Sequence, residues 1–341
     1  MPSDLFSPEN PYGMSFDGKV IRVSDQAYQI LILPECDYLP AHTARFAVQA
    51  AEQGFPVILV NRPPRALCED CAGEEAVVQA LSRCEAVPLA DLANAVSARV
   101  APRIVSCGPE PTLRTYCYQA DCGLVVLCFN ETTERTVNTS LLVRCEATAA
   151  ARYDAMKNQL YRLPAARQEE GISVPVRLEA GEACALILSG ALPQAPAYVP
   201  YPLSGEMLPG PWRLFWSDVA SQNFVFLREI AAGAALPDLT DWAAEHRFCG
   251  TLRYETAILS SCDQTRVLRL PPSVDVARVL VNGQAAGTCV GAPYCVEIPL
   301  RKGDNMVAVE VMTTPVYRVP DHHSGMTVLP PLGMTDPPML L

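Results

Sequence analysis

The first hundred residues alternate between short apolar runs and segments with helical spacing. Residues 28–34 form a nearly continuous apolar run, as expected of a buried parallel strand, and the Ala-rich segment 43–53 has the spacing of a helix. Gly54 ends that helix, and 56–60 is a second buried strand, so a right-handed parallel crossover is expected. Further helices are expected at 74–84 and 89–100. The pattern predicts a small α/β domain, amidotransferase- or flavodoxin-like, over residues 1–111.

The pattern changes from about Leu113 to β-rich segments separated by turns. Strands are expected at 123–129 and 135–145, and a hairpin at 174–188 that turns at 180–182. Together they predict an antiparallel, Ig-like β-sandwich over residues 112–191. The Pro-rich stretch 192–211 is typical of a linker.

The region 212–341 opens with aromatic and Ala-rich segments and becomes strongly β-like after Gly250. Strands are expected at 251–259, 265–270, 277–281, 294–300 and 306–313. Asn282-Gly283 accepts the positive φ angles of a type I′ hairpin, and Gly303-Asp304-Asn305 supplies another turn. The spacing predicts a sandwich or jelly roll, followed by an extended Pro-rich tail.

Composition and charge then restrict the partners. The chain has 341 residues and a formal net charge of -11, which repels nucleic acid and anionic lipid. Half of the residues are hydrophobic, enough for real cores. Residues 1–7 lack the pattern of a signal peptide, and prolines interrupt the long uncharged stretch 183–203. We therefore expect a cytoplasmic protein with neither nucleic acid nor membrane as partner.

The fourteen cysteines are scattered rather than clustered. In a long chain without a signal peptide, this distribution is typical of reduced, mostly buried thiols. Cys68 and Cys71 form a tight pair that Cys84 and Cys107 could complete as a four-thiolate zinc site, but core and loop thiols describe them as well. We expect no metal and no cofactor.

Several segments, taken in order, resemble the galactose-binding-like jelly roll of large glycoside hydrolases. They are Phe248 to Glu255 with its Gly-x-x-x-Tyr strand, Val279 to Thr288 with its Val-Asn-Gly hairpin, Leu300 to Asn305, and the tail Leu329 to Met334. The order is similar to that of family 2 sugar-binding domains and of the family 106 α-L-rhamnosidase group. Residues 18–21, 28–34 and 54–57 resemble the α/β domain that follows the catalytic barrel in the rhamnosidase-like proteins.

The resemblance implies a carbohydrate-related protein without its catalytic part. In these families the catalytic carboxylates lie in a (β/α)8 barrel of about 250 residues, and only about two strand-helix units are found here. The chain then corresponds to the C-terminal portion of a larger hydrolase, with an α/β domain cut short at its N-terminus, or to a relative without the barrel. We assign no catalytic residue, and expect a carbohydrate ligand and a catalytic barrel domain or chain as partners.

Sugar sites use aromatic faces together with a few polar groups that meet the hydroxyls. The candidates are Trp212, Trp216, Trp242, Arg253, Tyr254, Glu255, His322 and His323, the last two following Asp321. Core packing is the alternative for the aromatic residues, a solvated strand face for Arg253 and Glu255, and an exposed loop for the histidines.

Two further functions stay open beside carbohydrate binding or the support of a barrel. Residues 104–108 loosely resemble a nucleophile elbow around Cys107, which would suit a Cys-dependent amidotransferase-like enzyme with His42 as its partner. An elbow needs a following helix, whereas Pro109 and Pro111 follow here. The other alternative is a protein-interaction scaffold that binds no glycan. The main hypothesis is a non-catalytic accessory portion of a glycoside-hydrolase-like protein.

Overall fold

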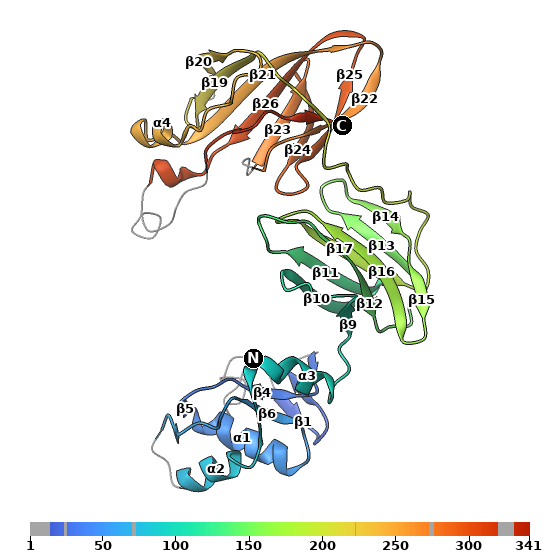
Figure 1. Cartoon of the computed structure of the whole chain (residues 1–341), viewed down its shortest axis with the longest axis vertical. Helices are drawn as coiled ribbons and strands as arrows, with labels where there is room; N and C mark the ends of the chain where they lie inside the picture. The colour runs from blue at the N-terminus through green and yellow to red at the C-terminus, as the bar shows by residue number, and fades with distance from the viewer. Residues whose placement is uncertain (1–13, 24–25, 70–72, 222, 273–275, 320–330) are drawn as a thin grey trace. The chain divides into compact units, whose positions relative to one another are not determined.

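A computed structural model describes residues 14–23, 26–69, 73–221, 223–272, 276–319 and 331–341 (Figure 1). The described chain is mostly β and contains several antiparallel sheets. It divides into two compact units, Met1–Arg103 and Ile104–Leu341. None of the described helices is long and apolar enough to cross a bilayer. The finer bounds of the three expected domains stay a prediction.

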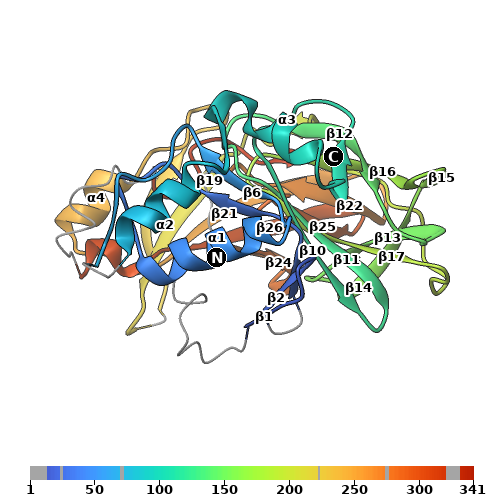
Figure 2. The same ribbon diagram turned by 90° about the horizontal axis from the view of Figure 1, so that it is seen from below.

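The first unit contains a parallel sheet in the order β4-β6-β8. Its elements are β1 (Met14–Phe16), β2 (Ile21–Val23), β3 (Gln26–Tyr28), β4 (Leu31–Leu33), β5 (Tyr38–Leu39), α1 (Ala41–Glu52), β6 (Val57–Val60), β7 (Ala66–Leu67), α2 (Glu74–Leu81), β8 (Glu85–Val87), the 3-10 turn Leu89–Asp91 and α3 (Leu92–Ser97). Helix α1 contacts α2 and β6 (Figure 1 and Figure 2), and its small buried residues Ala44, Ala47 and Ala50 let it approach closely. The predicted parallel strand-helix-strand unit is confirmed.

The second unit begins with two antiparallel sheets around one core. One has the order β10-β11-β17-β13-β14 and the other β15-β16-β12-β9. Their strands are β9 (Ile104–Ser106), β10 (Leu113–Ala120), β11 (Gly123–Asn130), β12 (Val137–Val143), β13 (Ala149–Asp154), β14 (Gln159–Leu163), β15 (Ala166–Gln168), β16 (Gly171–Leu178) and β17 (Ala183–Ser189).

The predicted hairpin at 174–188 is wrong, because β16 and β17 belong to different sheets. Burial alternates along β16 and along β17, so each strand has one buried face. The chain crosses from one sheet to the other between them, and the two buried faces then pack against each other in the core. The buried Asn130 side chain fixes the crossing by donating to the carbonyls of Glu179 (2.9 Å) and Leu178 (3.3 Å). A two-periodic pattern shows which residues are buried but not which strand is the partner.

The expected linker is tied to this sandwich rather than free. The Arg162 N–H donates to the Pro196 carbonyl at 2.7 Å, and the Tyr198 N–H donates to the Arg162 carbonyl at 2.9 Å. Proline lacks an N–H but keeps a carbonyl acceptor, so a Pro-rich segment can follow a strand edge. Further along, β18 (Glu206–Met207) pairs with β27 (Met339–Leu340) near the C-terminus.

The remaining strands form a six-stranded sheet, β20-β19-β21-β26-β23-β24, and a four-stranded sheet, β18-β27-β22-β25. The elements are β19 (Trp212–Asp218), β20 (Val225–Ile230), α4 (Thr240–Glu245), β21 (Gly250–Ser260), β22 (Gln264–Arg269), β23 (Val276–Val281), β24 (Gln284–Cys289), β25 (Cys295–Leu300), β26 (Gly303–Met312) and the 3-10 turn Pro315–Tyr317. Their inward side chains share one core that includes Trp212, Tyr254 and Ile298. The five predicted strands are confirmed, and β24 is the second strand of the predicted Asn-Gly hairpin, while β19 and β20 were missed.

The Asn-Gly turn between β23 and β24 is hydrogen-bonded to the start of β26. Asn282 and Gly283 have φ angles of 51° and 80°, and they join β23 to β24, which confirms the predicted hairpin. The Asn282 amide donates to Oδ1 of the fully buried Asn305 at 3.1 Å, and Asn305 accepts from the Arg301 N–H at 2.9 Å. Both asparagines of the resembling motifs therefore have a structural task.

The Gly-x-x-x-Tyr strand and the tail meet inside the core. The fully buried Tyr254 hydroxyl accepts from the Met334 N–H at 3.2 Å. Gly333 has a φ of +87°, and a Cβ at this position would lie 2.2 Å from the Tyr254 hydroxyl oxygen. Only glycine combines the left-handed backbone with so close an approach.

Ion pairs connect the two pairs of sheets within the second unit. Arg269 donates from both terminal nitrogens to the Glu179 carboxylate at 2.7 and 2.8 Å, and both side chains are largely buried. Lys157 Nζ lies 2.5 Å from Glu297 Oε1 and donates to the Tyr201 hydroxyl at 3.2 Å. The first pair is bidentate and shielded from water, so it constrains the geometry far more than an exposed pair.

Replacing Gly333 by Ala should lower the free energy of unfolding by about 2–4 kcal/mol, because it adds backbone strain and a clash. Gly283→Ala is the matched control, since its φ is +80° and nothing lies within 4 Å of the added Cβ. Denaturant unfolding measures both. The cost of Gly333→Ala should shrink in a Tyr254→Phe background, and equal costs for the two glycine variants would contradict the contact.

Glu179→Gln should cost about 3 kcal/mol of stability, since it leaves a buried Arg269 without its counter-charge. Glu146→Gln provides the control, because Glu146 pairs with Arg167 while its side chain is 98% exposed. The control should change stability by less than about 0.5 kcal/mol. Comparable losses for both variants in denaturant unfolding would show that the Glu179–Arg269 pair adds nothing.

Candidate functional site

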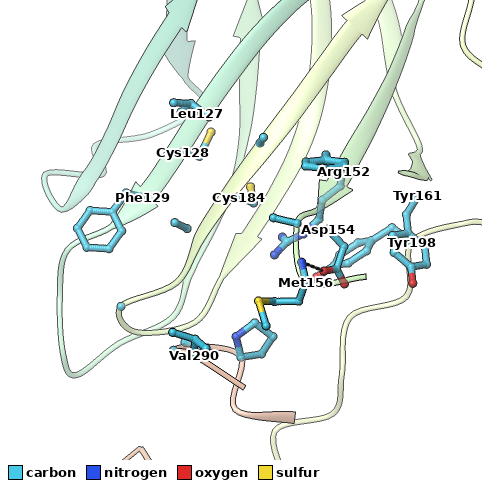
Figure 3. Close-up of a pocket in the computed structure, with 18 of the residues that line it drawn as sticks. Leu127, Cys128, Phe129, Arg152, Asp154, Met156, Tyr161, Cys184, Tyr198 and Val290 are labelled. Carbon is cyan, nitrogen blue, oxygen red and sulfur yellow. Dashed lines mark hydrogen bonds between the residues drawn. The ribbon is translucent and has the colours of Figure 1, made fainter. Parts of the chain in front are cut away.

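A pocket of about 630 Å³ lies where the five-stranded sheet meets the loop 290–293 (Figure 3). Strands β10, β11, β13, β14 and β17 contribute most of its lining, and residues 198 and 201 add to it from the segment that follows the sandwich. The Glu179–Arg269 and Lys157–Glu297 pairs join the two bodies that form its walls. The pocket therefore depends on how these parts of the second unit pack.

Aromatic rings dominate the lining. They belong to Tyr116, Phe129, Tyr153, Tyr161, Tyr198 and Tyr201. Tyr161 and Tyr198 pack edge to face, with ring centroids 6.3 Å apart. Tyr153 donates from its hydroxyl to Asn158 Oδ1 at 2.9 Å, which fixes the ring orientation. Rings held in this way offer flat apolar faces with polar edges.

Arg152 is the buried charge of the pocket. Its guanidinium pairs with the carboxylate of Glu182, itself 2% exposed, and its Cζ lies 4.6 Å from the centroid of the Tyr198 ring (Figure 3). Glu182 also accepts from the Glu179 N–H at 2.7 Å. Burial raises the pKa of the Glu182 carboxyl, although Arg152 acts against it. Burial acts to lower the pKa of Arg152, but Cys184 and Glu182 outweigh it and the pKa rises.

The other polar groups are held by local contacts. Asp154 accepts from the N–H groups of Met156 and Lys157, at 3.0 and 3.1 Å, and so closes the turn between β13 and β14. Burial raises the pKa of the Tyr198 hydroxyl to about 12, so it stays protonated and can donate. Within the part of the chain that the structure describes, no cluster of His, Cys, Asp and Glu could hold a metal ion. The arrangement is suited to binding a neutral molecule with an apolar face and hydroxyl groups.

The predicted aromatic candidates lie on β19, β21 and α4, and none of them belongs to the lining of this pocket. Trp212 and Tyr254 are fully buried in the core and present no surface to a ligand. Trp216 and Trp242 are partly buried against the same core, with ring centroids 5.9 Å apart. Trp242 also stacks on His246 at 4.9 Å. Core packing, the alternative for these residues, describes all of these contacts.

Arg253 and Glu255 belong to a network of charges across the six-stranded sheet. The register places Arg253, Glu310 and Arg278 opposite one another on β21, β26 and β23. The buried Glu310 carboxylate accepts from Arg253 Nε at 2.9 Å and from Arg278 Nε at 2.8 Å. Glu255 lies 3.8 Å from Arg253 and Arg213. These residues act first as cross-strand partners.

The remaining candidates are the two histidines of the C-terminal region and Cys107. His322 and His323, with Asp321, lie outside the described residues, as does Cys71. Cys107 follows β9, which pairs antiparallel with β12 in the sandwich, so no strand-to-helix elbow surrounds this thiol. Its supposed partner His42 lies on α1 in the first unit.

Sequence reasoning missed the pocket because its residues come from five strands and from several segments between them. Composition held one signal: six of the twelve tyrosines lie between 116 and 201. Five of these six, all but Tyr118, line the pocket. Arg152 could not be recognised, since a single Arg in a strand gives no sign of burial.

Comparisons with models of protein families and with curated proteins give no match. Among solved structures, a rhamnosidase from Novosphingobium sp. PP1Y aligns with 96% of this chain at a TM-score of 0.60 and 17% identity. An isomalto-dextranase from Arthrobacter globiformis T6, complexed with panose, aligns with 81% of this chain and 47% of its own, with a TM-score of only 0.18 and 11% identity.

The alignment with the rhamnosidase covers almost all of this chain but 35% of the other. At 17% identity the likeness concerns the fold and not the activity. The chain therefore shares its fold with a portion of that rhamnosidase that makes up about a third of its length.

Proposed function

We propose that this chain is a non-catalytic, carbohydrate-binding portion of a glycoside-hydrolase-like protein, and that the pocket formed by the five-stranded sheet and the loop 290–293 holds the sugar. The observation that carries the proposal is the packing of the Tyr161 and Tyr198 rings beside Arg152 in this pocket. Sugar rings have one apolar face that packs on aromatic rings and an equatorial set of hydroxyls that needs polar partners.

The proposal includes a finer assignment of the fold. Residues 112–191, together with β9 (Ile104–Ser106), are an Ig-like sandwich, 212–341 a galactose-binding-like jelly roll, and the residues before β9 a small α/β domain, as in the family 106 α-L-rhamnosidase group. The order of sheets in the second unit supports this assignment. A rhamnose-containing glycan is then the first ligand to test, because the similar solved structure is a rhamnosidase.

Binding rather than hydrolysis is supported by the carboxylates near the pocket. Asp154 is the one carboxylate among the described residues that line it, and its Oδ1 is occupied by two turn amides. The nearby Glu182 is paired with Arg152. Glycoside hydrolysis needs two carboxyl groups facing each other across the scissile bond. A catalytic barrel, if it acts with this chain, is supplied by another domain or chain.

A protein-interaction role is the second candidate. Tyr116, Tyr118, Leu127 and Phe129 are 58%, 41%, 42% and 42% exposed on β10 and β11. Such an apolar strip suits a protein partner as well as a sugar. The experiment below distinguishes the pocket from this strip as the place where a sugar binds, because Tyr118 belongs to the strip and not to the pocket lining.

Tyr161→Ala should weaken binding of a rhamnose oligosaccharide about tenfold or more, because the sugar loses a stacking face. Tyr161→Phe keeps the ring and should bind within about twofold of the parent. Tyr118→Ala is the matched control outside the pocket and should leave affinity unchanged. Calorimetry on the full chain, after a glycan array has selected the best rhamnose oligosaccharide, measures all three. Equal affinity for Tyr161→Ala and the parent would show that the sugar does not bind in this pocket.

The purified chain should bind without turnover. Incubation with an aryl α-L-rhamnoside should release no aryl alcohol above the uncatalysed rate, because no pair of carboxyl groups is available in the pocket. Chromatography of the free sugar gives an independent readout. Turnover that persists in Asp154→Asn would mean a catalytic site elsewhere in the chain, and turnover lost in that variant would make the pocket itself catalytic.

A further inference from the structure

Two cysteines face each other at the sandwich end of the pocket. Cys128 on β11 and Cys184 on β17 are register partners in neighbouring antiparallel strands, and Figure 3 shows both side chains. The two side chains are close enough for each to shift the pKa of the other. Both are free thiols in the structure.

We propose that Cys128 and Cys184 are a reversible dithiol-disulfide site that reacts with low-molecular-weight disulfides such as oxidised glutathione. Directly opposite residues in an antiparallel pair have Cα atoms about 4.5–5.5 Å apart, within the range that a disulfide spans. The register therefore places the two residues within reach of one disulfide. The inference does not depend on the ligand of the pocket.

No other cysteine in the described strands has this arrangement. Cys117 lies opposite Val126, Cys289 opposite Ala277 and Cys295 opposite Arg269. The pair is also reachable, because both residues line the pocket, and Cys184 is 8% exposed compared with 1% for Cys128. This difference makes Cys184 the thiol that meets the reagent first.

The local charges favour the same order. The hydrogen bond between the two thiols and the positive charge of Arg152 lower the pKa of Cys184, whereas the same hydrogen bond and burial raise the pKa of Cys128. The thiolate is the nucleophile in disulfide exchange. A hydrogen-bonded thiol pair with one partner beside a buried guanidinium is therefore prepared for a stepwise exchange.

The reaction has two steps. The Cys184 sulfur attacks one sulfur of oxidised glutathione, the disulfide of the reagent breaks, and one glutathione leaves with the proton that Cys184 released. The Cys128 sulfur then attacks the Cys184 sulfur of the mixed disulfide, and the second glutathione leaves with the Cys128 proton. The protein loses two electrons and two protons, and one oxidised glutathione becomes two reduced glutathiones.

Peptide mapping tests the proposal on the full chain. After incubation with oxidised glutathione, free thiols are alkylated in denaturant and the chain is cut with trypsin without reduction. The peptide 115–135, with Cys117, Cys122 and Cys128, should be linked to the peptide 178–213, whose single cysteine is Cys184. Fragment spectra should place the bond between Cys128 and Cys184, and dithiothreitol should remove it.

The exposed Cys107 and Cys262 show that the reagent worked, because they should appear as mixed disulfides. Alkylated Cys128 and Cys184 beside glutathionylated Cys107 would overturn the proposal. A second readout is the melting temperature, which a cross-link raises by several degrees by restricting the unfolded chain. This rise should vanish in Cys128→Ser and Cys184→Ser but persist in Cys117→Ser. An unchanged rise in the first two variants would also overturn it.

Discussion

The bidentate ion pair between Glu179 and Arg269 is the constraint on which the second unit depends. It joins the turn after β16 to the end of β22, and with it the sandwich to the following pair of sheets. Ion pairs at the surface are worth little, but a buried carboxylate and guanidinium leave each other only at the cost of an unpaired charge. The loop 290–293 is carried by the same pair of sheets, so this contact also sets the width of the pocket.

The same turn leads from this ion pair into the pocket. The backbone N–H of Glu179 donates to the Glu182 carboxylate, which pairs with Arg152. The fully buried side chain of Asn130 does not contact these charged groups. Its amide donates to the carbonyl of Glu179 and so fixes the turn. Each of these buried charges therefore has an oppositely charged partner, the condition under which burial of ions is tolerated. The side chain that gives the pocket its charge is oriented by the contact that joins the sheets.

The sequence was a good guide wherever burial follows a regular period. It predicted the strand-helix-strand unit around α1, the five strands after Gly250 and the Asn282-Gly283 turn, because these depend on local chemistry. It failed at 174–188, where the partner of each strand is decided by the other sheet. It gave little sign of the pocket, because Arg152 and Tyr161 are opposite each other in the β13–β14 hairpin but Tyr198 and the loop 290–293 reach them only in the folded unit.

The motifs of the resemblance and the candidate site are separate for a physical reason. The motif residues are recognisable because their positions accept a single residue type. They are Asn282, Asn305, Tyr254 and Gly333. A sugar site restricts the sequence less, since several aromatic residues can stack on a sugar ring and several polar residues can hydrogen-bond a hydroxyl. A fold can therefore keep its structural motifs while its ligand surface changes. Such motifs identify the architecture, and the binding site must be found from the packing that the architecture permits.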